Sequence, residues 1–167
     1  MGKIISSVLI LFCIIYSCNS AGNNKAEKIV KEQNISNQNR AKDFVVIEID
    51  STNSFMFKGL KPAKLNKDEI ESIHNIVEAC VNAYNDERNY SKDDSEYLSL
   101  INYSRQYIAY YNKKGEKEVW ANFYSGNLDG VDRKQILIVE DGGNSYFQLN
   151  INLDKNKCED LSVNGVA

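Results

Sequence analysis

The chain has 167 residues, 43% of them hydrophobic, with a formal net charge of −3 and a single histidine. A mildly acidic chain gives no electrostatic reason to expect nucleic acid or an anionic lipid surface as a partner. Nucleophilic catalysis by a Ser-His or Cys-His pair would have to use that one histidine, His74.

Residues 1–17 have the features of a secretory signal peptide. Lys3 supplies a positive charge, and an apolar run extends from Val8 to Ile15. The run is shorter than the about 20 apolar residues that a transmembrane helix needs, so it fits the core of a signal peptide. It ends in Ile15-Tyr16-Ser17-Cys18, a tetrapeptide that resembles the bacterial lipobox.

The lipobox resemblance implies that Cys18 is acylated and that the precursor is cut after Ser17. A single acyl chain binds membranes only marginally, and bacterial lipoproteins carry two or three, so the resemblance implies firm attachment. We therefore expect a lipid-anchored protein of the bacterial cell envelope, on the periplasmic side or at the cell surface. The alternative is cleavage elsewhere, for example after Ala21, which would discard Cys18.

Residues 18–42 are interpreted as the lipidated N-terminus and a flexible tether. From residue 19 to 42 the sequence is rich in Asn, Gln, Lys and Glu, and its only large apolar residues are Ile29, Val30 and Ile35. Such a segment cannot bury enough surface to offset its ordering entropy, although residues 25–33 could be transiently helical. Residues 43–167 are predicted to form one globular domain.

The domain is predicted to begin with a strand over residues 44–49, followed by a long helix. Asn66 can cap this helix, and Glu69 can complete a capping box. Polar residues end the helix near residues 87–89, and residues 90–105 are ambiguous. One face carries apolar residues at helical spacing, namely Ile70, Ile73, Val77, Cys80, Val81 and Tyr84.

The remaining sequence reads as strands separated by turns. Strands are predicted at residues 107–112, 119–124, 136–139 and 146–153, and a last short one holds Leu161 and Val163. Turns are expected at residues 113–115 and at Asp141-Gly142-Gly143-Asn144. The predicted fold is α+β, with one long helix packed on one face of an antiparallel sheet of about four to five strands.

Two resemblances accompany this element order. The order itself resembles cystatin-like and β-lactamase-inhibitor-like domains, but no cystatin protease-binding motif is present, so that activity is not implied. The stretches 141–147, 150–153 and 163–165 are similar to uncharacterised small lipoproteins of the Bacteroidota. Asp50-Ser51-Thr52 resembles the three-residue O-glycosylation site of that phylum, with Ser51 as acceptor.

No set of residues predicts catalysis, a cofactor or a metal site. His74 lies at the rim of the apolar helix face, where a packing role is expected. Asp129, Asp132 and Asp141 do not have the spacing of an EF-hand loop. Zinc prefers several Cys or His ligands, and cleavage would leave only His74, Cys80 and Cys158.

Cys80 and Cys158 are a candidate disulfide, because exported domains meet an oxidising compartment. The alternative is that Cys80 packs in the core as a free thiol. Cys158 is out of phase with Leu161 and Val163 unless the last strand bulges or starts later.

Aromatic residues are predicted to gather on the sheet face away from the helix. Successive side chains of a strand point to opposite faces of the sheet. If Val119, Ala121 and Phe123 face the helix, the residues that alternate with them face away from it. Tyr and Trp beside amides are common in contact surfaces, although these rings could merely pair across strands. We therefore expect a non-catalytic binding or inhibitory domain with a protein or small-ligand partner; the alternatives are a small accessory enzyme and a structural or immunity-type protein. The predicted outward set is Trp120, Tyr124, Tyr107, Tyr111, Tyr146 and Asn122.

Overall fold

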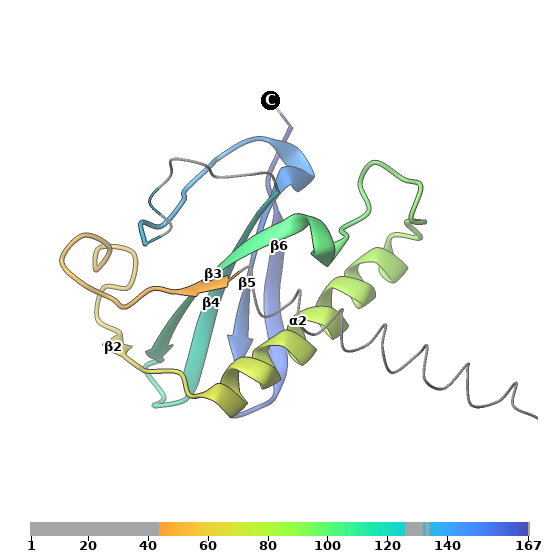
Figure 1. The fold of residues 1–167 in the computed structure, drawn as a ribbon. Coiled ribbons are helices and arrows are strands. Elements are labelled where there is room, and N and C mark those ends of the chain that lie inside the picture. Colours follow the sequence, from red (N-terminus) through yellow and green to blue (C-terminus); the bar gives the residue numbers. More distant parts are fainter. Residues whose placement is uncertain (1–43, 126–131, 133, 167) are drawn as a thin grey trace, which may run out of the picture. The chain divides into compact units, whose positions relative to one another are not determined.

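The computed structural model describes residues 44–125, 132 and 134–166 (Figure 1). The predicted signal peptide, Cys18 and the predicted tether over residues 18–42 lie outside the described residues. Within the described ranges, no helix is both long enough and apolar enough to cross a membrane.

The described part consists of one long helix against a mainly antiparallel sheet, which confirms the predicted α+β fold. The sheet has the order β1-β3-β4-β5-β6, with β2 pairing with β3. Figure 1 shows α2 lying across the sheet beside β6. The elements are β1 (Phe44–Val46), β2 (Lys61–Pro62), α2 (Lys67–Glu87), β3 (Tyr103–Tyr111), β4 (Lys117–Ser125), β5 (Tyr146–Asn152) and β6 (Lys157–Val163), with short 3-10 helices at Leu100–Asn102 and Gly143–Ser145.

The first strand departs from the expected antiparallel arrangement. β1 pairs with β3 in parallel, with Phe44 opposite Arg105 and Val46 opposite Tyr107. Parallel neighbours need a long crossover connection, usually through a helix, and here the connection contains α2. β1 also ends at Val46, earlier than the predicted residue 49.

The helix begins where the sequence predicts. The Asn66 side-chain oxygen accepts a hydrogen bond from the backbone N–H of Glu69 at 2.9 Å. The Glu69 carboxylate in turn accepts one from the backbone N–H of Asn66, also at 2.9 Å. This capping box satisfies two of the backbone N–H groups that a helix start leaves without partners.

The sheet has a hydrophobic core on each side. The helix-side core joins α2 to β3, β4 and β5 through residues such as Val77, Phe123 and Leu149, all at most 1% exposed. A smaller outer core lies on the opposite face, where Ile47 and Phe57 pack on Ile108 and Tyr110. The middle strands therefore lie between two layers, and the face away from the helix is only partly open.

The strand predicted at residues 136–139 is wrong. These residues form an irregular segment without strand pairing among the described residues. Ile136 packs against the outer core, so the apolar run covers the sheet instead of joining it. The following turn forms as expected, and Gly142 has a φ of 91°, a left-handed conformation that glycine adopts without steric cost.

Candidate binding surface

The structure divides the predicted outward residues between the two faces of the sheet. Trp120, Asn122 and Tyr124 lie on the face away from the helix, since their neighbours Val119 and Phe123 belong to the helix-side core. The outward placement predicted for these three residues is confirmed.

The outward placement of Tyr107 and Tyr111 is wrong. Tyr107 is fully buried in the helix-side core, with its ring centroid 5.6 Å from that of Phe44 and 6.0 Å from that of His74. Tyr111 lies four residues further along β3 and therefore faces the same side. Both faces of β3 are buried, so its sequence shows no alternation of polar and apolar residues that would tell which side chains face the helix.

The segment over residues 47–60 covers part of the outer face. Ile47 extends the pairing of β1, with its N–H donating to the carbonyl of Tyr107 at 2.9 Å. The ring of Phe57 lies 5.6 Å from Tyr110 and makes an edge contact with Trp120 at 6.2 Å. This contact holds one side of the tryptophan, which is only half-buried.

A second covering segment, residues 134–141, is held down by amide side chains. Asn122 donates to the carbonyl of Leu137 at 2.8 Å, and Gln106 accepts from the N–H of Leu137 at 3.0 Å. Gln106 also donates to the carbonyl of Gln135 at 2.6 Å. Asn122 is therefore 4% exposed and Tyr124 is fully buried, so neither can contact a partner in this conformation.

The accessible remainder of this face is a strip over β4, β5 and β6, which we call the outer strip. Trp120 lies opposite Asn150, and Asn150 lies opposite Glu159. Gln148 lies opposite Ser162 in the next row of cross-strand pairs. The outer strip consists of Trp120, Tyr146, Gln148, Asn150, Glu159 and Ser162, all half-buried or exposed.

Carboxylates at one end of the outer strip are already paired. Glu116 accepts hydrogen bonds from Lys155 at 2.8 Å and from Asn112 and Asn152 at 3.0 Å each, and these bonds lower the pKa of Glu116 to about 2. Lys157 forms an ion pair with Glu159 at 2.8 Å and lowers its pKa. At neutral pH these carboxylates are therefore charged hydrogen-bond acceptors.

The other candidate residues lie apart from the outer strip. His74 is 8% exposed, and its ring makes an edge contact with Phe44 at 5.3 Å. Asp132 and Asp141 are exposed, and Asp129 lies outside the described residues. In the part of the chain that the structure describes, no group of three or more His, Cys, Asp or Glu side chains could hold a metal ion.

Ser51 lies exposed in a turn of the segment that covers the outer face. The Asp50 carboxylate accepts hydrogen bonds from the Thr52 N–H at 2.7 Å and from its hydroxyl at 2.6 Å, and these bonds lower the pKa of Asp50. The turn leaves the Ser51 side chain accessible. Glycosylation of Ser51 stays a prediction.

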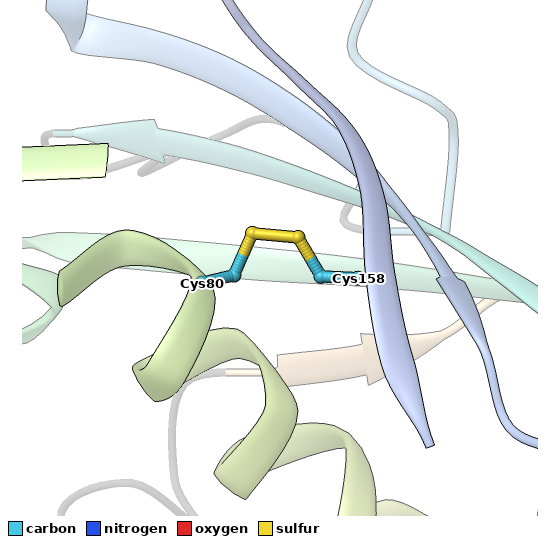
Figure 2. The surroundings of a disulfide bond; sticks show 2 residues. All are labelled: Cys80 and Cys158. Atoms are coloured by element: carbon cyan, nitrogen blue, oxygen red, sulfur yellow. A yellow bond between two sulfur atoms is a disulfide. The ribbon is translucent and has the colours of Figure 1, made fainter. Parts of the chain in front are cut away.

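Sequence reasoning missed a groove between α2 and β6, with a volume of about 720 Å³. A disulfide between Cys80 and Cys158 forms part of its lining (Figure 2). The small residues Ala79 and Ala83 on the flank of the helix are a sequence signal that could have indicated this groove. We call it the α2–β6 groove.

Comparison with known proteins gives no relative: no protein-family model, curated protein or solved structure matches the chain.

Proposed function

We propose that this chain is a non-catalytic binding protein of the bacterial cell envelope, anchored through a lipid on Cys18, that contacts its partner with the outer strip. The position of Trp120 carries the proposal. One side of its ring is held by Phe57, while the residue, opposite Asn150, remains only half-buried. An aromatic side chain that is already held loses little entropy on binding.

The chemistry of the outer strip suits a contact surface. Tryptophan and tyrosine dominate binding hot spots, and amides such as those of Gln148 and Asn150 supply adaptable hydrogen bonds. Tyr146 is held as well, because its ring lies so close to Gly142 that an added Cβ would be 2.8 Å from it. The partner we propose is a protein surface or a small ligand with many hydrogen-bonding groups.

The proposed role is non-catalytic because ionisable side chains in and around the outer strip already take part in ion pairs or hydrogen bonds within the fold. Glu116 is held by Lys155, and Glu159 by Lys157. The Tyr110 hydroxyl donates to the Asn150 side-chain oxygen at 3.4 Å, and burial raises the pKa of this tyrosine well above its usual range. A general acid or base would need a titratable group available to a substrate.

The proposal is tested by partner capture with the full-length protein and three variants. Ser162→Arg places a bulky side chain at an exposed position of the outer strip, and Trp120→Ala removes the proposed anchor. Phe55→Ala is the matched control, since Phe55 is 69% exposed and lies outside the strip. Envelope extract of the producing bacterium is applied to each, and captured proteins and glycans are quantified by mass spectrometry.

We expect one partner to be retained by the wild-type protein and by Phe55→Ala. It should be lost from Ser162→Arg, and Trp120→Ala should weaken its binding by about 2 kcal/mol, roughly 30-fold. Thermal melts separate binding from folding, because Trp120→Ala also removes the contact with Phe57, and any resulting loss of stability shows in the melt independently of partner capture. Normal capture by Ser162→Arg with a normal melt would contradict the proposal.

A further inference from the structure

We propose that the α2–β6 groove is a second binding site, which takes a short extended peptide carrying a carboxylate at the Arg88 end. The groove lies between the helix and the edge strand, so it is separate from the outer strip. Its lining includes Asn75, Ile76, Ala79, Tyr84, Arg88 and Leu161.

The dimensions of the groove fit an extended chain. Its lining on the helix side runs from Ser72 to Arg88, the residue that follows α2, which is about 24 Å at the rise of an α-helix. That length corresponds to about seven residues of extended peptide. Ile76, Tyr84 and Leu161 give the groove an apolar floor, while Ala79 on the helix keeps it open.

The rims of the groove carry groups that suit a peptide backbone. Among the described residues, β6 pairs only with β5, so its outer edge presents backbone N–H and C=O groups. Asn75 on the helix and Asn156 before β6 add exposed side-chain amides. An edge strand beside a groove is the geometry in which proteins bind an extended peptide as an added strand.

Glu87 and Arg88 both line one end of the groove, and the Arg88 guanidinium indicates which group of a peptide can bind there. The Arg88 guanidinium carbon lies 3.7 Å from the centroid of the Tyr84 ring. No carboxylate among the described residues lies within ion-pair distance of Arg88, so its N–H groups can serve a ligand. A guanidinium that is held by stacking on a ring is preorganised to donate two parallel hydrogen bonds to a carboxylate.

The edge of β6 favours a short peptide over a second copy of the chain. Asp160 has a φ of 54°, and the pairing with β5 shifts register there, so the edge is interrupted by a bulge. Bulges and charged side chains on an edge strand oppose continuous pairing between long strands. A partner can therefore use only a few backbone hydrogen bonds and must gain the rest from the floor and Arg88.

The test selects random twelve-residue peptides from a display library on the oxidised full-length protein. Enriched peptides are synthesised, labelled and measured by fluorescence polarisation. We expect apolar peptides with an acidic group whose affinity falls about tenfold or more in Arg88→Gln, because a charge-assisted hydrogen bond is lost. Ala79→Arg, which fills the groove from an exposed helix position, should abolish binding.

Matched controls separate this site from the outer strip. Lys92→Gln removes an exposed cation that does not line the groove, and Ser162→Arg blocks the outer strip. Both should bind the peptides normally, so this proposal and the proposed function fail independently. Amidating the peptide C-terminus, or replacing its Glu by Gln, identifies which carboxylate reaches Arg88.

Three results would overturn the groove proposal. One is that no peptide is enriched over a control protein. The second is equal binding of the selected peptides by wild type, Arg88→Gln and Ala79→Arg. The third is that removing every peptide carboxylate leaves affinity unchanged, which would disprove the role of Arg88. A normal thermal melt for each variant shows that the fold is intact.

Discussion

The Sγ atoms of Cys80 and Cys158 are bonded, which ties the middle of α2 to the edge strand β6 with the two Cα atoms 6.0 Å apart. A bulge makes this possible. Gln148 pairs with Ser162 and Asn150 with Glu159, so β6 has one residue more than β5 between these pairs. The extra residue brings Cys158 into phase with Leu161, and both belong to the layer packed against the helix.

We predict that reducing this disulfide lowers the free energy of unfolding by about 4 kcal/mol. The bond closes a loop with a sequence separation of 78 residues, and the cross-link stabilises mainly by restricting the unfolded chain. Urea unfolding of the oxidised and reduced protein measures the difference. The variant with Cys80→Ala and Cys158→Ala should match the reduced protein closely and should not respond to reductant.

Thiol titration of the denatured, non-reduced mature protein provides a direct check of this bond. Neither Cys80 nor Cys158 should react. Two reactive thiols at these positions would rule the bond out.

Local sequence signals were sufficient where one side of an element faces solvent. The capping box of Asn66 and Glu69 and the apolar spacing predicted α2 within two residues at its C-terminal end. β5 alternates between buried residues such as Leu149 and half-buried residues such as Gln148, so its phase was also correct. In these elements the pattern directly reflects which side meets water.

The candidate site was harder to predict because it depends on which segments cover the sheet. Ile108 and Tyr107 lie on opposite faces of β3 and are both fully buried, so no alternation indicates their direction. The apolar residues near Ile136 look like a strand but cover the outer core. Tyr124 was assigned to the correct face, yet burial removes it from any contact.

We predict that Tyr107→Phe reduces the loss of folding stability at alkaline pH. Burial raises the pKa of Tyr107 from 10.0 to about 12, opposed by the nearby positive charge of Arg105. The folded state favours the protonated phenol. Its contribution is therefore complete below pH 10 and is lost as the pH rises through about 12. Urea unfolding should show that the free energy of unfolding falls between pH 9 and 12 by roughly 2–3 kcal/mol less in Tyr107→Phe than in the wild type.

The same variant is informative at pH 7. The Tyr107 hydroxyl is fully buried and, among the described residues, makes no hydrogen bond of good geometry, although the neighbouring Arg105 side chain interacts with it closely enough to lower its pKa. Removing an unpaired buried hydroxyl should leave stability unchanged or slightly higher. A clear destabilisation at pH 7 would show that the hydroxyl has a partner.

We predict that Asn122→Ala loosens the segment over residues 134–141. The change removes the donor to the Leu137 carbonyl and to the Gln106 side-chain oxygen, which lie 2.8 and 3.1 Å from the Asn122 amide nitrogen. The Gln106 oxygen keeps the Leu137 N–H as a donor, whereas the Leu137 carbonyl loses its donor, which should cost about 1–3 kcal/mol. Hydrogen exchange of the Leu137 amide should become faster in the variant, while exchange of the strand amides stays slow.

Asn75→Ala is the matched control for this prediction, since Asn75 is exposed on α2. Its effect on stability should stay within about 0.5 kcal/mol. Unchanged exchange at Leu137 in Asn122→Ala would mean that the covering segment is held by its apolar contacts alone.

We predict that Cys18→Ser abolishes lipid labelling and leaves the precursor uncut before residue 18. The prediction rests on the apolar run from Val8 to Ile15 and on the lipobox-like tetrapeptide that follows it. Cells are fed labelled palmitate, and the protein is examined for label and for the mass of its N-terminus. Cys13→Ser is the matched control, because Cys13 lies inside the apolar run, and this variant should be labelled and cut normally. Unchanged incorporation of label in Cys18→Ser would contradict the lipid anchor. Cleavage of the wild type after Ala21, without label, would show a signal peptide of a different kind.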